Sequence, residues 1–184
     1  MMKEILFITG NDEKFREFQE ILTKVELVRK KIDLPELQGT PEEIVTEKAQ
    51  LAAKITGKPC FVDDTSLCFN EWGDLPGPYI KDFLKYMGNE KLSQTLVNST
   101  DNHKAKALTS IGYCEPGEKA VCIQGFTEGN ITLPRGENNF KKGWDQIFSP
   151  GDDERTYAEM TSQEKHSFSQ RMKAIKKFEE FLGE

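Results

Sequence analysis

The stretch EILFITGNDEKFREFQEIL, residues 4–22, decides the fold class because a strand pattern and a helix pattern meet in it. Residues 4–9 form a short apolar run that Gly10 ends, which predicts a buried strand. The apolar residues between positions 15 and 22 recur at helical spacing, so we expect a helix that begins near Asn11 or Asp12. A strand followed directly by a helix indicates an α/β protein.

The rest of the chain continues this alternation and adds a strand pair. Strands are expected at residues 25–32, 60–62, 105–114 and 120–127, and helices at 41–56, 79–87, 89–97 and, as one amphipathic helix, 162–182. Thr40, Pro41 and Glu43 supply an N-cap, a favourable first residue and a capping box for the first of these helices. The predicted fold is α/β with a mixed sheet, in one domain over residues 1–184.

Composition argues against several classes of protein. No apolar stretch is long enough to span a bilayer, and Lys3 and Glu4 interrupt the N-terminus, so a soluble cytoplasmic protein is expected. The net charge of −6 argues against a sequence-independent nucleic-acid binder, which needs a basic surface. The four cysteines form no C-x-x-C pair, so we interpret them as reduced, partly buried thiols rather than a zinc site.

Four short stretches together indicate a site for a magnesium nucleoside triphosphate. They read TGNDEK at residues 9–14, VDDT at 62–65, LPGPYIK at 75–81 and GWD at 143–145. Each lies beside an expected strand end or helix start, and together they offer backbone amides, lysines, carboxylates and an aromatic ring.

The loop at residues 9–14 joins a strand to a helix, so unpaired amide N–H groups are expected to face outward there. Lys14 falls in the first helical turn, where a cation is unfavourable unless an anion lies nearby. The alternative is an ordinary turn in which Asn11 or Asp12 caps the helix. The loop alone slightly favours that alternative, because it lacks the glycines of known phosphate-binding loops.

Asp63 and Asp64 are expected to end a buried strand, where α/β proteins usually carry functional loops. Neighbouring side chains of a strand point to opposite faces, so only one of the two can face a cleft directly. Magnesium needs one or two protein carboxylates, and Glu36 offers the second. Helix capping and solvation explain the same acids about equally well.

The remaining candidates each have a common alternative. Trp144 offers a platform for a base, although a buried tryptophan more often belongs to the core. Lys81 could reach a phosphate, although a solvated lysine is the usual case. Lys165 and Arg171 would face different parts of the surface of one continuous helix.

The chain resembles the inosine triphosphate pyrophosphatase family, and its eukaryotic branch in particular. The resemblance covers nearly the whole chain through the ordered blocks TGNDEK, KIDLPELQGTPEEI, VDDTSLCFN, LPGPYIKDF, GWDQIF, TYAEM and EKHSFSQR. It implies an elongated two-lobed α/β fold around a long mixed sheet flanked by helices, usually a homodimer, with the nucleotide in the cleft between the lobes. It also implies Mg²⁺-dependent hydrolysis of ITP, dITP and XTP to the monophosphate and pyrophosphate, with Mn²⁺ as a substitute metal.

By matching position, the resemblance assigns roles to individual residues. Asp64 would be the catalytic residue that accepts a proton from the attacking water, and Glu36 and Asp64 would hold the metal. Contacts to the triphosphate and cleft would come from Thr9, Gly10, Asn11, Lys14, Lys48, Thr65 and Lys81. The base and sugar would be surrounded by Lys142, Gly143, Trp144, Asp145, Lys165, Ser169, Gln170 and Arg171.

Two departures from the family pattern fall at the base end. The closing motif is usually Ser-His-Arg, and Gln170 stands at the histidine position. An aromatic residue usually precedes Gly-Trp-Asp, where this chain has Lys142, with Phe140 two positions earlier. Base selectivity is therefore open, and a pyrophosphatase for another modified nucleotide is one rival. A nucleotide-binding protein without turnover is the other, although it would not need the carboxylates of Glu36 and Asp64.

Overall fold

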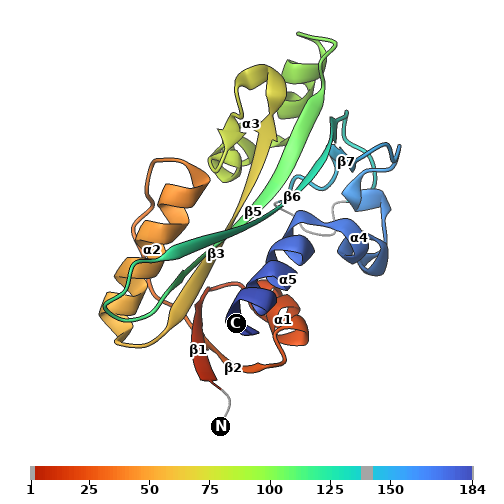
Figure 1. Cartoon of the computed structure of the whole chain (residues 1–184). Coiled ribbons are helices and arrows are strands. Elements are labelled where there is room, and N and C mark those ends of the chain that lie inside the picture. Colours follow the sequence, from red (N-terminus) through yellow and green to blue (C-terminus); the bar gives the residue numbers. More distant parts are fainter. Residues whose placement is uncertain (1–2, 138–142, 184) are drawn as a thin grey trace. The chain divides into compact units, whose positions relative to one another are not determined.

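The computed structural model describes residues 3–137 and 143–183, in which strands and helices alternate (Figure 1). The elements are β1 (Lys3–Ile8), α1 (Asp12–Ile21), β2 (Val25–Lys30), α2 (Pro41–Thr56), β3 (Cys60–Phe69), η1 (Asn70–Trp72), β4 (Pro76–Gly77), α3 (Ile80–Val97), β5 (Lys104–Cys114), β6 (Val121–Ile131), β7 (Phe148–Pro150), η2 (Tyr157–Glu159), α4 (Ser162–Phe168) and α5 (Gln170–Gly183). The sheet has seven strands in the order β2-β1-β3-β5-β6-β7, with β4 attached to β3. β1 and β2 are parallel, whereas β3–β4 and β6–β7 are antiparallel. The predicted α/β class with a mixed sheet is confirmed.

The chain divides into two compact units, each with its own apolar core. Unit 1 holds the residues up to Asp64, Thr109–Gly125 and the chain from Lys173 onward. Unit 2 holds Thr65–Leu108 and Phe126–Met172. The assignment of the whole chain to a single domain stays a prediction.

In unit 1, both faces of β1 are buried. Ile5 and Phe7 pack in one cluster with side chains of α1 and α5, and Leu6 and Ile8 pack in another with side chains of α2. Successive side chains of a strand point to opposite faces, so a strand covered on both sides needs an unbroken apolar run. This is why residues 5–8 could be recognised as a buried strand.

Local capping sets both ends of α2 as predicted. The Thr40 hydroxyl accepts from the Glu43 amide at 3.2 Å, and the Glu43 carboxylate accepts from the Thr40 amide at 2.8 Å. These hydrogen bonds from Thr40 hold the pKa of Glu43 below its usual value. At the other end Gly57 adopts a φ of 64°, and its amide donates to the Ala53 carbonyl at 2.9 Å.

β3 does not end at Asp64, so the prediction that Asp63 and Asp64 close a strand is wrong. The strand continues to Phe69, and its far half pairs with β4, where Leu67 lies opposite Gly77. This pairing keeps the polar residues 63–66 extended, because their neighbours on both sides are held in the sheet. An apolar pattern in the sequence cannot show that partner.

Two helix predictions have different outcomes. Gly88 divides α3 into two helical segments, as the patterns at 79–87 and 89–97 predict, with a φ of 71° and a ψ of 172° that glycine almost alone adopts. The continuous helix at 162–182 is wrong, because Ser169 is extended between α4 and α5. The Ser169 hydroxyl accepts from the Met172 amide at 3.2 Å, as an N-cap does, and so starts a second helix.

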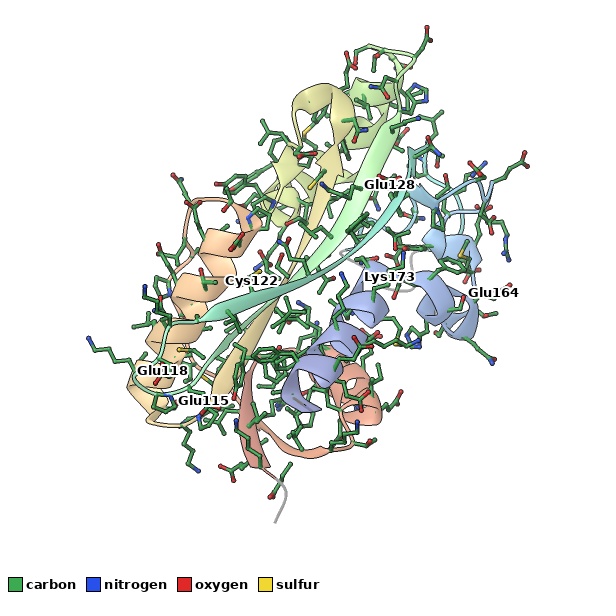
Figure 2. All side chains as sticks on the ribbon, in the orientation of Figure 1. Glu115, Glu118, Cys122, Glu128, Glu164 and Lys173 are labelled. Atoms are coloured by element: carbon green, nitrogen blue, oxygen red, sulfur yellow. The ribbon has the colours of Figure 1, made fainter. Side chains whose placement is uncertain are left out.

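The predicted strand pair is confirmed as β5 and β6, although β6 runs on to Ile131. The turn between them carries Glu115 and Glu118 (Figure 2). The Glu118 amide donates to the Glu115 carbonyl at 3.1 Å, and Gly117 supplies the φ of 84° that closes the turn.

The cysteines are free thiols, as interpreted from the sequence. Cys60, Cys68 and Cys114 are buried, and Cys122 is partly buried. Burial raises the pKa of Cys60, Cys68 and Cys122 to about 11, so these thiols stay protonated at neutral pH. No helix in the described part of the chain is long and apolar enough to cross a membrane.

Candidate active site

The loop between β1 and α1 is closed by its own side chains. Asn11 caps α1, and its carbonyl oxygen accepts from the amides of Glu13 at 2.9 Å and Lys14 at 3.2 Å. The Thr9 hydroxyl accepts from the Asn11 amide at 3.1 Å. The prediction of unpaired amides is therefore wrong for these three residues, since short polar side chains beside them supply the acceptors. Gly10 is exposed at the tip of the loop.

Lys14 lies in the first turn of α1, where a cation is unfavourable without a nearby anion, and Asp63 supplies that anion. Its ammonium lies 3.0 Å from one carboxylate oxygen of Asp63 and 3.1 Å from the other. The Asp63 side chain is 2% exposed and that of Lys14 is 22% exposed, so this is a largely buried ion pair. Losing either partner would leave a desolvated charge behind.

Strand alternation explains why Asp63, rather than Asp64, reaches Lys14. Phe61 packs against Phe18 of α1 with ring centroids 5.2 Å apart, and Asp63 follows Phe61 on the same face of β3. Val62 packs in the cluster that includes α2, which places Asp64 on the α2 face. The predicted site omits Asp63. Its relation to Phe61 is visible in the sequence, but only packing shows that α1 covers that face.

A second ion pair joins two predicted site residues of different roles. The ammonium of Lys48, on α2, lies 3.1 Å from the carboxylate of Glu36. The Glu36 side chain is 83% exposed, and that of Lys48 is 17% exposed. The Glu36 carboxylate can be solvated by water when it leaves the lysine, because it is exposed, whereas the less exposed Lys48 ammonium then needs another acceptor.

The carboxylates of unit 1 suit a metal that a substrate helps to hold. Among residues 3–137 and 143–183, no group of three or more His, Cys, Asp or Glu side chains could hold a metal ion by itself. Magnesium keeps several waters and is usually bound through one or two carboxylates plus substrate phosphates. Glu36, exposed beside a lysine, and Asp64 fit that arrangement in their donor chemistry.

Two further candidates, Thr65 and Lys81, belong to unit 2, and a third, Lys142, lies outside the described residues. The Thr65 hydroxyl is buried without a hydrogen-bond partner, so it has capacity to bind a ligand group. Lys81 is exposed in the first turn of α3, where an anion would again offset the helix dipole. Lys142, like Phe140, lies outside the described residues.

The Gly143-Trp144-Asp145 segment is anchored in the aromatic core of unit 2. The Trp144 ring is edge-on to Phe148, with centroids 5.5 Å apart, and the residue is 7% exposed. The indole of Trp144 thus lies in the core, which is the alternative weighed from the sequence. Stacking of this ring on a base stays a prediction. Asp145 and Lys165 meet, with carboxylate and ammonium 2.5 Å apart. The structure therefore brings together two residues predicted to surround the base.

Gln170 has a partner that the sequence did not suggest. The residue is 4% exposed, and its carbonyl oxygen accepts from the Tyr157 hydroxyl at 3.2 Å. Burial raises the pKa of Tyr157, so the hydroxyl remains a donor at neutral pH. Tyr157 belongs to the TYAEM block, and its distance from Gln170 in the chain gave no signal of contact. Arg171 follows on the first turn of α5 and is partly buried.

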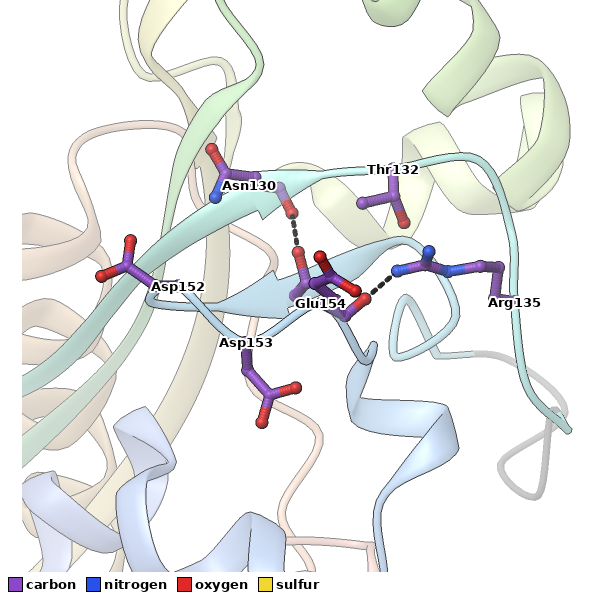
Figure 3. A pocket seen from close by; sticks show the side chains of 7 residues that line it. Asn130, Thr132, Arg135, Asp152, Asp153 and Glu154 are labelled. Carbon is purple, nitrogen blue, oxygen red and sulfur yellow. Dashed lines mark hydrogen bonds between the residues drawn. The ribbon is translucent and has the colours of Figure 1, made fainter.

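An open pocket of about 610 Å³ in unit 2 is not the candidate nucleotide site (Figure 3). It is lined by Asn130, Thr132, Arg135, Ser149, Asp152, Asp153 and Glu154. The Arg135 guanidinium donates to the Glu154 carbonyl, while three acidic side chains make the wall negative. Such a wall repels a triphosphate, and no predicted site residue lines it.

The chain is similar to proteins of one family along nearly its whole length. The sequence model of the Ham1 family matches residues 5–181. An inosine triphosphate pyrophosphatase of Yarrowia lipolytica is 45% identical over 183 residues, which cover 98% of this chain and 96% of the relative. One of Puccinia graminis f. sp. tritici is 42% identical over 189 residues, covering 98% and 97%. A solved HAM1 protein from Coxiella burnetii superimposes with a TM-score of 0.87 at 28% identity, over 99% of each chain.

Proposed function

Because this chain belongs to the Ham1 family, we propose that it hydrolyses the noncanonical purine nucleotides ITP, dITP and XTP to the monophosphate and pyrophosphate. The activity would remove damaged nucleotides from the nucleotide pool. The names of the relatives supply the substrate class. The observation that carries the proposal is the pairing of two lysines with carboxylates in unit 1, Lys14 with Asp63 and Lys48 with Glu36.

A magnesium triphosphate offers a new partner to the charges in those pairs. A phosphate oxygen can replace Glu36 as the acceptor for Lys48 while Glu36 turns to the metal, and another phosphate oxygen can join Asp63 as an acceptor for Lys14. Every charge keeps an opposite partner, so none is left uncompensated. Asp63, almost fully buried, stays beside Lys14 and orients its ammonium.

Glu36 and Asp64 would hold the magnesium, for which we propose Mn²⁺ as a substitute. When bound, the metal neutralises charge on the triphosphate and the leaving pyrophosphate. Asp64 accepts a proton as the oxygen of water bonds to phosphorus and the anhydride bond between the α and β phosphates breaks. Lys14 and Lys48 stabilise the phosphate charge during this displacement.

At the base end, Tyr157 holds the Gln170 side chain by one hydrogen bond. Its hydroxyl donates to the Gln170 carbonyl, and in this orientation the amide NH₂ is available to a ligand. Hypoxanthine and xanthine carry an acceptor oxygen at position 6, whereas adenine carries an amino donor. A donor from Gln170 or from Arg171 therefore favours ITP and XTP over ATP.

Product analysis with a panel of triphosphates tests the proposal. ITP should yield IMP and pyrophosphate with magnesium and nothing without it, and Glu36→Gln should raise the magnesium concentration needed for half-maximal rate. IDP and orthophosphate as first products would contradict the bond assignment. Tight binding of ITP without turnover would favour a binding protein, and preference for a different modified nucleotide would favour the other rival.

Two further expectations belong to the proposal. We propose that the chain acts as a homodimer and in the cytoplasm. Sedimentation of the purified protein measures the first, and fractionation of the source cells measures the second.

A further inference from the structure

We propose that Asn89 and Gln146 form a positioning pair that holds the backbone before Trp144 and thereby sets affinity for the nucleotide base. The effect on affinity rests on the proposed function and on the place beside the base that the family resemblance gives Trp144. The holding of the backbone stands on contacts within unit 2 alone.

The two side-chain amides form a bridge between loop carbonyls. The Asn89 NH₂ donates to the Gly143 carbonyl at 2.9 Å and to the Gln146 side-chain oxygen at 3.3 Å. The Gln146 NH₂ donates to the Gly136 carbonyl at 2.8 Å. Every acceptor is a carbonyl oxygen, so turning either amide over would set oxygen against oxygen. The bridge thus has one orientation, and it reaches backbone on both sides of residues 137–142.

The Gly143 carbonyl is held differently from the three that follow it. The carbonyls of Trp144, Asp145 and Gln146 accept from the backbone amides of Ile147, Ala158 and Arg135, each at 3.0 Å. The Gly143 carbonyl accepts from the side chain of Asn89. A substitution at Asn89 can therefore release the start of the Trp144 turn without touching the backbone bonds that form the rest of it.

Asn89 is itself held in place by the kink in α3. Gly88 ends the first helical segment, and the second is anchored by Leu92 and Leu96, both 0% exposed, in the core cluster that contains Trp144. The side-chain carbonyl oxygen of Asn89 is buried without a hydrogen-bond partner. A buried acceptor left unpaired is unfavourable, so the two bonds from the NH₂ group are what the side chain contributes here.

The test uses Asn89→Ala and the isosteric Asn89→Asp, which replaces the donating NH₂ by an acceptor. Thr95→Ala is the matched control, since Thr95 is exposed on the same helix and bonds only within it, to the Lys91 carbonyl at 2.7 Å. A Trp72→Phe background, first shown to keep the parent kcat/KM, leaves Trp144 as the sole tryptophan. Acrylamide quenching of its fluorescence then reports on the turn independently of activity.

We expect both Asn89 variants to increase the quenching of Trp144 by about 2-fold, through local opening of the turn. The KM for ITP should rise by roughly 10-fold with kcat within about 2-fold, the pattern of lost uniform binding. Thr95→Ala should change neither. Gln146→Ala removes the same bridge from its other end and should reproduce both effects, with the double variant less than additive.

Unchanged quenching in the Asn89 and Gln146 variants, or a lower melting temperature with quenching and KM unchanged, would overturn the positioning role. Raised quenching with an unchanged KM would overturn its effect on affinity. If the parent protein hydrolysed no triphosphate, the proposed function would fail, while the quenching measurements would still decide whether the pair holds the turn.

Discussion

Two groups of residues, one in unit 1 and one in unit 2, are built on different principles. In unit 1, Lys14 with Asp63 and Lys48 with Glu36 are opposite charges that pair with one another, and Glu36 in particular is largely exposed. In unit 2, Trp144, Tyr157 and Gln170 are 7% exposed or less and are held by ring contacts and hydrogen bonds.

This difference matches what the two ends of a nucleotide require. A triphosphate with its metal brings several charges, so the protein needs charges that can change partner without being stranded. A base brings few charges and a defined pattern of donors and acceptors, so the protein needs groups whose orientation is fixed beforehand. Substitutions in unit 1 should therefore change rate, and those in unit 2 should change selectivity.

The largest expected effect is at Asp64. Asp64→Asn should lower kcat for ITP by at least ~10²-fold, because a positioned proton acceptor is lost. Rates measured at saturating magnesium, together with circular dichroism, test this. A folded variant with near-normal turnover would transfer the role of proton acceptor to Glu36 or Asp63, which also belong to unit 1.

The next effect concerns the buried pair of Lys14 and Asp63. Lys14→Met should lower kcat/KM by roughly 10- to 100-fold, because a charge-assisted bond to phosphate is lost. It should also lower the free energy of unfolding by at least about 1 kcal/mol, because Asp63 is left without its cation. Adding Asp63→Asn should restore stability but not activity. Denaturation and kinetics measure the two quantities. If the double variant recovered both stability and activity, the pair of Lys14 and Asp63 would have a structural role only.

A smaller effect is expected at Tyr157, which contacts Gln170 at the proposed base end of the site. Tyr157→Phe removes the hydroxyl that orients Gln170, so the ratio of kcat/KM for ITP over ATP should fall by roughly 10-fold, while kcat for ITP changes little. Phe168→Leu, on a ring 6.4 Å from Tyr157, is a packing control that keeps the hydroxyl and should keep the ratio. Equal losses for ITP and ATP in the Tyr157 variant would show that Gln170 does not discriminate between them.

The smallest effect is expected from Gln170→His. The imidazole would restore the residue type usual in the family, and it should increase the preference for ITP over GTP by about 3-fold, less than the loss of a whole hydrogen bond. Competition assays with both nucleotides resolve such a change. If the relative kcat/KM values for ITP, XTP and GTP were the same in the variant as in the parent, Gln170 would have no part in base selection.

Local features were open to prediction because their causes lie within a few residues of the chain. The buried run of β1, the Asn11 cap of α1 and the Thr40–Glu43 capping box follow from side-chain period and short-range hydrogen bonds. The break at Ser169 was missed, although its cause is local, because a regular apolar spacing continues through it. The candidate residues came from the motifs and the family resemblance rather than from periodicity.

What the sequence by itself determined is the class of the fold, the ends of its first helices and the residue types available for a nucleotide. Tertiary structure alone decided that β3 runs past Asp64, because its partner β4 is brought to it by the chain that follows. It alone decided that Asp63 meets Lys14, that Glu36 meets Lys48 and that Tyr157 meets Gln170. Each contact joins residues on different elements, and which face a helix covers depends on packing that short-range sequence patterns do not encode.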